Sequence, residues 1–377
     1  MLLLGVMPGK ENKMNYDLKE IFGYFTAEGT FLKGEPYGSG HIHDTFLVET
    51  VEKEKDDYIL QRLNNNIFKN IPELQHNIER VTVHLRNKLK SVAGSDIKRE
   101  CLSLVPSREG KSWIVDRNGN FWRMYIFISN HRSYNIVDSP DKAFEGGKAI
   151  GRFQAMLADM PGEPLFETIP SFHDIEKRLQ TLSLKIKENP AGRVSSVTKE
   201  IDMVLQRAEE MKIILKLGRE GKIPVRITHN DTKFNNILLD ENDKALCVID
   251  LDTVMPGYVH YDFGDAIRTA ANTAAEDEQD LSKVNMDIRL FKAYAEGYLS
   301  ETGKTLNNIE KEYLAFAPKL ITYTIAVRFL TDFIDGDKYF KIHSELHNLQ
   351  RTRAQLKLVM SMEEQYGDMQ KIIRDLT

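Results

Sequence analysis

The sequence contains only two cysteines, Cys101 and Cys247, each inside an apolar stretch. This argues against a disulfide-rich scaffold and fits a reducing compartment. The sequence also lacks a run of about 18 apolar residues, the length that a membrane-spanning helix needs. Its net charge of −5 gives no basic excess for neutralising phosphates. We therefore expect a cytoplasmic protein with no membrane association, no nucleic-acid partner and no obligate protein partner.

Internal repeats and low-complexity segments are absent as well. The apolar start, residues 1–7, is too short for a signal peptide and has no basic region before it. We interpret it as a disordered leader before Met14, a second candidate start. Hydrophobic residues make up 41% of the sequence and charged residues 28%, which is typical of a soluble globular protein. The length of 377 residues leaves room for two domains.

The hydrophobic pattern changes along the chain. The first third predicts a short helix at 15–25, a longer helix at 73–90, and strands at 43–51, 57–63, 102–105, 113–116 and 121–128. Helical periodicity then dominates, at 141–160, 172–188, 194–218, 262–276, 284–301, 308–335 and 340–365. One strand pair, around 237–249, interrupts the helices. We predict the α+β class, with a small mixed-sheet N-terminal lobe (1–130) and a mostly helical C-terminal lobe (131–377).

The most informative segment is a predicted β-hairpin. Two short apolar strands, 237–239 and 245–249, enclose a polar turn. Asn236 enters the first strand and Asp250 leaves the second, so their backbones are expected roughly 5 Å apart. Both side chains carry oxygens, the ligand type that Mg²⁺ prefers. The hairpin therefore predicts a divalent-metal site, although a surface hairpin with polar turns would have the same pattern.

Two further polar residues precede the hairpin. The carboxylate of Asp231 is placed to accept or orient the proton of an attacking hydroxyl. Lys233 supplies a positive charge beside a phosphoryl group, and phosphoryl transfer depends on such positioning and charge neutralisation. His229 fits a buried residue that braces the loop better than a catalyst. Asp252 fits a further metal contact and a structural role at the strand end equally well.

The ordered set His229-Asn230-Asp231, Asn236 and Asp250 resembles the catalytic loop and metal-binding aspartate of the aminoglycoside phosphotransferase and choline kinase superfamily. It is also similar to the corresponding set of protein kinases. The resemblance implies a protein-kinase-like two-lobed fold with ATP as phosphate donor. It implies that Asp231 is the catalytic base or positioning residue and that Asn236 and Asp250 hold Mg²⁺. Lys233 matches the protein-kinase variant, whereas many aminoglycoside kinases have histidine there.

A glycine-containing segment is the candidate nucleotide loop. Gly38, Ser39 and Gly40 are placed to cover ATP phosphates with backbone N–H groups. The segment departs from Gly-x-Gly-x-x-Gly because His43 occupies the third glycine position. A plain hairpin turn would explain the segment about as well.

The strand lysine of kinases has no obvious match in this sequence. Arg62 lies where that lysine would fall, and its guanidinium can hold two phosphate oxygens at once. Its expected helix partner is Glu79, with Glu73 as the alternative. Each of these glutamates would equally suit a solvent-facing position.

A closer resemblance is to N-acetylhexosamine 1-kinases, which transfer the γ-phosphate of ATP to the anomeric hydroxyl of GlcNAc or GalNAc. It spans roughly residues 34–350 and implies a sugar 1-kinase of carbohydrate metabolism. The segments that carry it are Gly38–Ile42, Tyr58–Asn64, His229–Asn236, Ile249–Gly257, Arg328–Phe333 and Gly336–Phe340.

The expected acceptor site lies mainly near the C-terminus. Arg328 and Asp332 are four residues apart and share one helix face. With His41 and Tyr339 they offer donors, acceptors and an aromatic surface, the mixture that a polyhydroxyl ligand needs. An intrahelical ion pair between Arg328 and Asp332 is the alternative.

Two further polar positions are expected at helix starts. Asp262 is predicted to be a helix N-cap that orders its region. Phe172-His173-Asp174 opens another helix, and a capping role fits it better than contact with an acceptor.

Other functions remain open on the residues alone. The acceptor of a kinase of this superfamily can be choline, homoserine, an aminoglycoside or another sugar. An aminoglycoside pocket would be heavily acidic, and residues 276–280 are the one acidic run. Choline would need an aromatic cage, of which the sequence shows no concentrated example. A pseudokinase that binds without turnover is disfavoured by the intact Asp231, Asn236 and Asp250.

Overall fold

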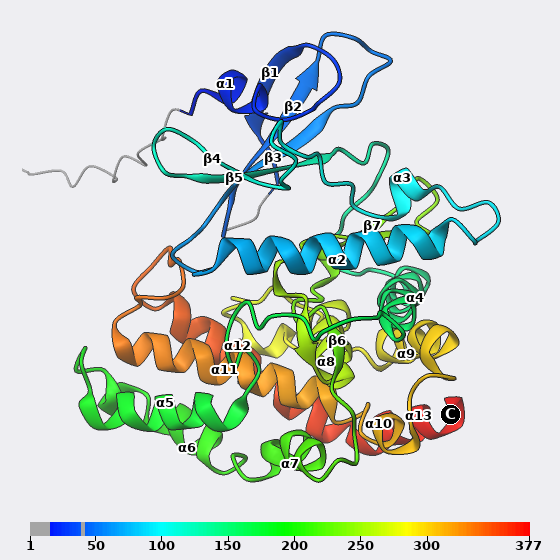
Figure 1. The fold of residues 1–377 in the computed structure, drawn as a ribbon. Coiled ribbons are helices and arrows are strands. Elements are labelled where there is room, and N and C mark those ends of the chain that lie inside the picture. Colours follow the sequence, from blue (N-terminus) through cyan, green and yellow to red (C-terminus); the bar gives the residue numbers. More distant parts are fainter. Residues whose placement is uncertain (1–15, 39–41) are drawn as a thin grey trace, which may run out of the picture. The chain divides into compact units, whose positions relative to one another are not determined.

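The computed structural model describes residues 16–38 and 42–377 (Figure 1). The chain divides into two compact units. The first contains the residues up to Asn64 together with Leu104–Phe127, and the second contains Asn65–Ser103 together with Ile128–Thr377. Strands dominate the first unit and helices the second, so the predicted α+β class is confirmed.

The first unit is built on a five-stranded sheet with the order β1-β2-β3-β5-β4. Its elements are α1 (Leu18–Phe22), β1 (Phe31–Pro36), β2 (Asp44–Thr50), β3 (Tyr58–Leu63), β4 (Ile114–Val115) and β5 (Phe121–Ile126). All pairs are antiparallel, so the expectation of a mixed sheet is wrong. Three of the four pairs join consecutive strands, whose short connections reverse the chain direction. The strand predicted at 102–105 is only an isolated bridge between Leu104 and Tyr125.

The core of this unit explains the strand pattern. Val48, Leu60, Trp122 and Met124 are completely buried, because alternate residues of a strand face the same side of the sheet. The indole Nε1 of Trp122 donates to Asp116 Oδ2 at 2.9 Å, so burial leaves no unpaired donor on this ring. Burial of each large apolar side chain contributes about 1.5–3 kcal/mol.

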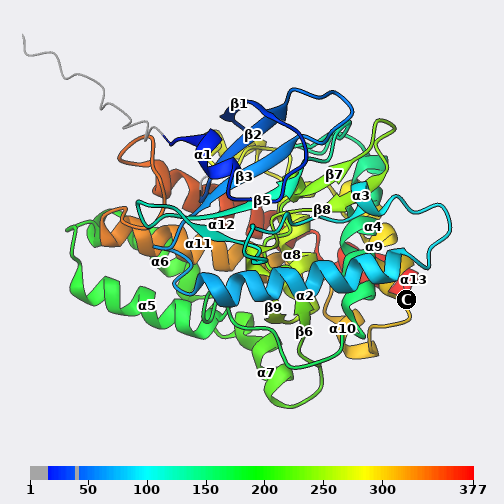
Figure 2. The same ribbon diagram turned by 45° about the horizontal axis from the view of Figure 1, so that its top comes forward.

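The second unit contains most of the helices and four short strands (Figure 2). Helix α4 packs on α9, and α11 packs on α8, α12 and α5. The helices are α2 (Ile71–Leu89), α3 (Ile97–Glu100), α4 (Pro140–Leu157), α5 (Ile175–Glu188), α6 (Thr198–Leu205), α7 (Ile213–Arg219), α8 (Val259–Ala270), α9 (Ile288–Thr302), α10 (Asn308–Glu312), α11 (Ala317–Asp335), α12 (His347–Glu364) and α13 (Tyr366–Leu376). The strands are β6 (Arg226–Thr228), β7 (Ile237–Leu239), β8 (Ala245–Val248) and β9 (Met255–Gly257). Within the described residues, no helix has both the length and the apolar character required to cross a membrane.

Several predicted helices are divided or shifted. The segment 194–218 forms α6 and α7 instead of one helix, and 308–335 forms α10 and α11. Pro318 lies in the first turn of α11, where its missing N–H costs no helical hydrogen bond, so a new helix begins there. The helix predicted at 340–365 begins only at His347. The helix α13 and the pair β6–β9 were not predicted.

A buried asparagine, Asn77, connects helix α2 to other parts of the helical unit by hydrogen bonds. The Asn77 side-chain amide donates to the carbonyls of Phe166, at 2.8 Å, and Val254, at 3.1 Å. Its oxygen accepts the Phe166 N–H at 3.0 Å. Because buried amides require such partners, Asn77 fixes α2 to the chain that follows Asp250.

Candidate active site

Two antiparallel strand pairs hold the segment predicted to carry the chemistry. The predicted hairpin is confirmed, because β7 pairs with β8 and Ile237 lies opposite Val248. At its open end the Ile249 N–H donates to the Asn236 carbonyl at 2.9 Å. Asn236 and Asp250 therefore flank one end of the hairpin. The second pair, β6 with β9, encloses the loop that contains Asp231.

The side chain of Asn236 has a defined orientation. Its Nδ2 donates to the backbone oxygen of Asp231 at 2.8 Å and to Asp231 Oδ2 at 3.3 Å. Because both contacts use the amide nitrogen, the amide oxygen is directed away from Asp231. Asp250 has a φ of 60°, a left-handed conformation that is uncommon for a residue with a Cβ and that clusters at active sites. These oxygens fit the preference of Mg²⁺, which binds one or two protein side chains and fills its other positions with water and phosphate oxygens.

Asp231 and Lys233 form an ion pair of 3.2 Å between Oδ1 and Nζ. Burial alone would raise the pKa of Asp231, but the positive charge of Lys233 and its hydrogen bond oppose burial, and the pKa lies below its ordinary value. The same pair raises the pKa of Lys233, chiefly through Asp231. The site therefore presents a carboxylate and an ammonium group side by side over a wide pH range.

His229 braces the loop, as predicted. The ring is completely buried, and its Nε2 lies 2.8 Å from the carbonyl of Ile249. Its Nδ1 accepts the backbone N–H of Asp231 at 3.2 Å. The Nε2 must carry the proton, because a carbonyl only accepts. One imidazole thus connects the residue before Asp250 to the backbone of Asp231.

Asp262 has a larger role than the predicted helix cap. It lies within α8, whose N-cap is Tyr258, so the capping prediction is wrong. Its carboxylate accepts the backbone N–H groups of His229, at 2.9 Å, and Asn230, at 2.7 Å. It also accepts Gln154 Nε2 at 2.6 Å. Burial raises the pKa of Asp262, and these donors oppose the rise. Asp262 orders the loop that precedes Asp231, and only this part of its prediction is confirmed.

A further charge network lies on α8 after Asp262, with Asp265 and Arg268 buried. The Arg268 guanidinium contacts Asp265 and Glu276, each at 2.8 Å. The hydroxyl of the next residue, Thr269, accepts the backbone N–H of Phe234 at 3.1 Å. The loop is therefore supported by α8 over its whole length.

The sequence pattern of the phosphotransferase enzyme family (APH) matches residues 33–303, well over half of the chain. The chain belongs to this family. Its members are enzymes that transfer a phosphoryl group, which agrees with the carboxylate, cation and oxygen donors gathered around Asp231.

Solved structures share the fold of this phosphotransferase at low identity. One is an aminoglycoside phosphotransferase from Alicyclobacillus acidocaldarius, with 11% identity, a TM-score of 0.60, and coverage of 94% of this chain and 96% of that one. A microcompartment-associated aminopropanol kinase has 15% identity, a TM-score of 0.56 and coverage of 93% and 97%. An amicoumacin kinase in complex with AMP-PNP and Ca²⁺ has 13% identity, a TM-score of 0.58 and coverage of 91% and 93%. At these identities the similarity shows the fold, and the acceptors of these proteins differ.

In this phosphotransferase, an arginine stacked among aromatic rings lies near the loop that contains Asp231. The Arg328 guanidinium is 5.0 Å from the Phe172 ring, 5.7 Å from Tyr339 and 5.3 Å from Phe340. Phe172 adjoins His173, whose Nε2 is 2.9 Å from the carbonyl of Asn230, the residue before Asp231. Arg328 and Tyr339 are therefore close to each other. Residues 171–174 connect them to the loop that contains Asp231.

The Asp332 side chain is buried and accepts hydrogen bonds from its own chain instead of pointing to solvent. Its carboxylate accepts the backbone N–H groups of Lys338, Tyr339 and Phe340 at 2.8–2.9 Å, and Asn348 Nδ2 at 2.9 Å. No ion pair with Arg328 is found in the described part of the chain. Asp332 thus shapes the turn that carries Tyr339, a function that its helical spacing from Arg328 did not indicate.

The predicted nucleotide-binding residues belong to both units. Arg62 lies in β3, where its Nη1 contacts Asp44 Oδ2 at 3.2 Å and its Nε donates to Asn120 at 3.1 Å. Glu79 is exposed on α2, in the second unit, and its pairing with Arg62 stays a prediction. Gly38 has a φ of 77°, as a tight turn requires. Ser39, Gly40 and His41 lie outside the described residues.

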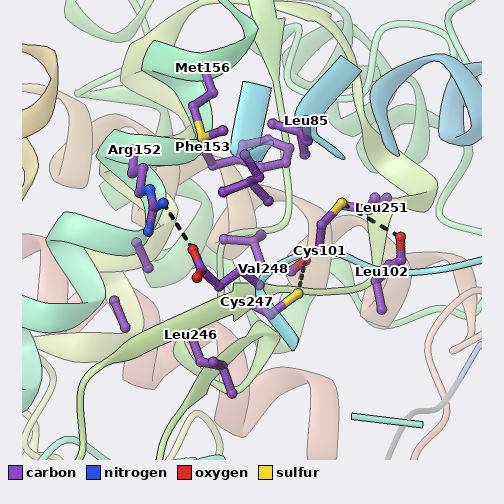
Figure 3. Close-up of a pocket in the computed structure, with 14 residues that line it drawn as sticks. Leu85, Cys101, Leu102, Arg152, Phe153, Met156, Leu246, Cys247, Val248 and Leu251 are labelled. Carbon is purple, nitrogen blue, oxygen red and sulfur yellow. Dashed lines mark hydrogen bonds and ion pairs between the residues drawn. The ribbon is translucent and has the colours of Figure 1, made fainter. Parts of the chain in front are cut away.

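A small apolar cavity of about 50 Å³ lies behind the hairpin (Figure 3). Its walls come from α2, α4 and β8 and include both cysteines, which are free thiols. Burial raises the pKa of Cys101 to about 12 and that of Cys247 well above its ordinary value, so both stay protonated. Arg152 and Glu100 form an ion pair of 2.9 Å at this site. Strand β8, which leads to Asp250, therefore lacks close packing on one side.

Proposed function

We propose that this phosphotransferase transfers the γ-phosphate of ATP to the anomeric hydroxyl of an N-acetylhexosamine, GlcNAc or GalNAc, to give the sugar 1-phosphate. The observation that carries the proposal is the Arg328 guanidinium, stacked on aromatic rings beside the catalytic loop. In the proposed division of labour, residues 1–130 form the nucleotide-binding lobe, and residues 131–377 contain the catalytic loop and the acceptor site.

The acceptor side favours a neutral, hydroxyl-bearing ligand. The hydrogen bond that Arg328 makes within the described chain is a long one, 3.5 Å, to the Tyr339 hydroxyl. Its N–H groups therefore suit the hydroxyl and carbonyl oxygens of an N-acetyl sugar, and the exposed Tyr339 ring suits the apolar face of a pyranose. Arg178 adds a second guanidinium to this region. Neither guanidinium forms an ion pair within the described residues, and this local positive charge disfavours choline and aminoglycosides, which are themselves cationic.

The geometry of the loop supports the proposed catalytic roles. Asp231 orients the acceptor hydroxyl and accepts its proton, and Lys233 places positive charge beside the transferring group. Asn236 and Asp250 would hold Mg²⁺, which neutralises phosphate charge when bound. Gly38, Ser39, Gly40, Arg62 and Glu79 are the residues proposed to bind the nucleotide. His41 is proposed to contact the sugar.

The experiment that tests this function is a panel of acceptors. Purified protein with ATP and Mg²⁺ should convert GlcNAc or GalNAc to a product that ³¹P NMR identifies as the 1-phosphate. Glucose, choline, homoserine and kanamycin should react at least about tenfold more slowly in kcat/KM, a difference of about 1.4 kcal/mol. Arg328→Lys keeps the charge but loses the planar donor fork, so it should raise the acceptor KM and leave the KM for ATP unchanged. If the protein phosphorylates another panel member and neither N-acetyl sugar, the proposed acceptor is wrong.

Replacement of Asp250 by asparagine should weaken metal binding specifically. The substitution removes one negative charge from the proposed Mg²⁺ site, and we expect the Mg²⁺ concentration for half-maximal activity to rise by about 100-fold. A titration of activity with Mg²⁺ at saturating ATP measures this change. Asp202→Asn, at an exposed position on α6, is the matched control and should keep the wild-type Mg²⁺ dependence. An unchanged Mg²⁺ curve for Asp250→Asn would remove Asp250 from the metal site.

A further inference from the structure

The short turn before α5, Ser171–Asp174, is strained and firmly held. Ser171 has a φ of 58°, a left-handed conformation that costs a residue with a Cβ about 1–3 kcal/mol. Asp174 caps α5 by accepting the Lys177 N–H at 3.0 Å. Helix capping needs Asp174 alone and does not account for the conformation of Ser171. Such strain persists only where surrounding contacts maintain it.

His173 contacts the catalytic loop from this turn. Its ring is buried, and its Nε2 lies 2.9 Å from the Asn230 carbonyl. Since a carbonyl only accepts, Nε2 carries the proton and donates. Asn230 has a φ of 65°, so this hydrogen bond holds a second left-handed residue directly before Asp231.

The environment keeps the His173 ring neutral. Burial lowers the pKa of His173 to about 3, although the hydrogen bond to Asn230 opposes this shift. The ring packs between Phe172, at 4.6 Å, and Tyr261, at 5.0 Å. Its Nδ1 has no hydrogen-bond partner in the described part of the chain. A buried unpaired nitrogen is unfavourable, so packing alone would be served better by leucine or phenylalanine.

The neighbouring residue of the turn faces the proposed acceptor side. The Phe172 carbonyl accepts both Nε, at 3.3 Å, and Nη2, at 2.8 Å, of Arg178. The Phe172 ring lies 5.0 Å from the Arg328 guanidinium. Adjacent residues of one rigid turn thus contact the acceptor arginine and the backbone next to Asp231.

From these contacts we propose that His173 is a positioning residue, which fixes the backbone at Asn230 and couples acceptor binding at Phe172 and Arg328 to the placement of Asp231. The inference rests on the proposed phosphoryl transfer at Asp231, but it does not depend on which acceptor is used. Displacement of a catalytic group by about 1 Å lowers rates by about 100-fold. Loss of this hydrogen bond should therefore reduce kcat more than it changes either KM.

Two His173 variants separate the hydrogen bond from the packing. His173→Phe keeps a ring between Phe172 and Tyr261 but has no donor, and we expect kcat to fall by about 100-fold. His173→Gln places a donor nitrogen near the position of Nε2 and should recover at least about tenfold of that loss. The KM for ATP should stay within about twofold in both variants. Wild-type kcat in His173→Phe would overturn the proposal, and so would equal losses in the two variants.

Asp174→Ala is the matched control, because it alters the same turn and removes only the cap of α5. It should leave kcat within about threefold of wild type while lowering the melting temperature. A fall in kcat equal to that of His173→Phe would mean that the whole turn acts through stability, and the proposal would fail.

Hydrogen exchange followed by mass spectrometry gives a readout that needs no turnover. The amides of residues 228–232 should exchange faster in His173→Phe than in wild type. Addition of the acceptor that wild type phosphorylates should slow this exchange in wild type and much less in the variant. If the panel yields no acceptor, faster exchange still supports the positioning role while the proposed function fails. Equal exchange in the two proteins would overturn the positioning role itself.

Discussion

Replacement of Asp231 by asparagine will lower kcat by about 10³-fold, because the amide cannot accept the proton of the attacking hydroxyl. Asparagine keeps the shape of the side chain, so the melting temperature should stay close to that of wild type. The pKa of Asp231 is held below its ordinary value of 3.8, so the carboxylate stays ionised above that pH. Any acid limb that Asp231 contributes to the pH profile should therefore lie below 3.8.

The comparison uses two asparagine variants of the same chain. Asp202→Asn removes one carboxylate from the exposed surface of α6 and should keep wild-type kcat. Binding of a fluorescent ATP analogue, measured in each variant, distinguishes lost chemistry from lost nucleotide binding. If Asp231→Asn retains more than about a tenth of wild-type kcat, Asp231 is not the base.

Replacement of Asp262 by alanine should reduce both stability and activity. The change leaves the backbone N–H groups of His229 and Asn230 and the Gln154 amide without their acceptor. Each buried unsatisfied donor costs about 1–3 kcal/mol, so the free energy of unfolding should fall by about 3 kcal/mol. Because the same amides shape the loop before Asp231, we also expect kcat to drop in the remaining folded protein.

Urea denaturation followed by circular dichroism measures the stability loss. Asp202→Ala provides the control, since its side chain is exposed and its removal should change the free energy of unfolding by no more than about 0.5 kcal/mol. A stability equal to wild type for Asp262→Ala would show that water replaces the carboxylate, and the loop would then not depend on α8.

Short-range patterns account for the parts of the fold that were predicted correctly. The hairpin β7–β8 was predicted because its two apolar strands and their polar turn lie next to each other in the sequence. Helix α4 was predicted because its apolar residues recur with helical spacing over several turns, as expected for a helix with one buried face. The antiparallel β6–β9 pair was missed because each strand has three residues, too few to show alternation, and Arg226 pairs with the distant Gly257.

The partners of the supporting residues escaped prediction for a similar reason. Asp262 and His229 are 33 residues apart, and His173 and Asn230 are 57 apart. Tertiary packing alone brings such pairs together, and no local pattern reports it. The spacing of Arg328 and Asp332 suggested a shared helix face. The adjacent turn instead supplies backbone N–H donors that occupy Asp332. Asp231, Asn236 and Asp250 could be proposed because they lie close together in sequence.

The cavity behind β8 has an evolutionary consequence. Core positions normally resist added volume, since one extra methylene forces neighbouring side chains out of their preferred rotamers. Cys247 borders unfilled space of about 50 Å³, so a somewhat larger apolar residue fits there without displacing α2 or α4. Among related sequences, position 247 can therefore vary in size more freely than its neighbours in the hairpin. Asp250 follows three residues later, beyond the end of β8, and its proposed role as a metal ligand would allow no such variation.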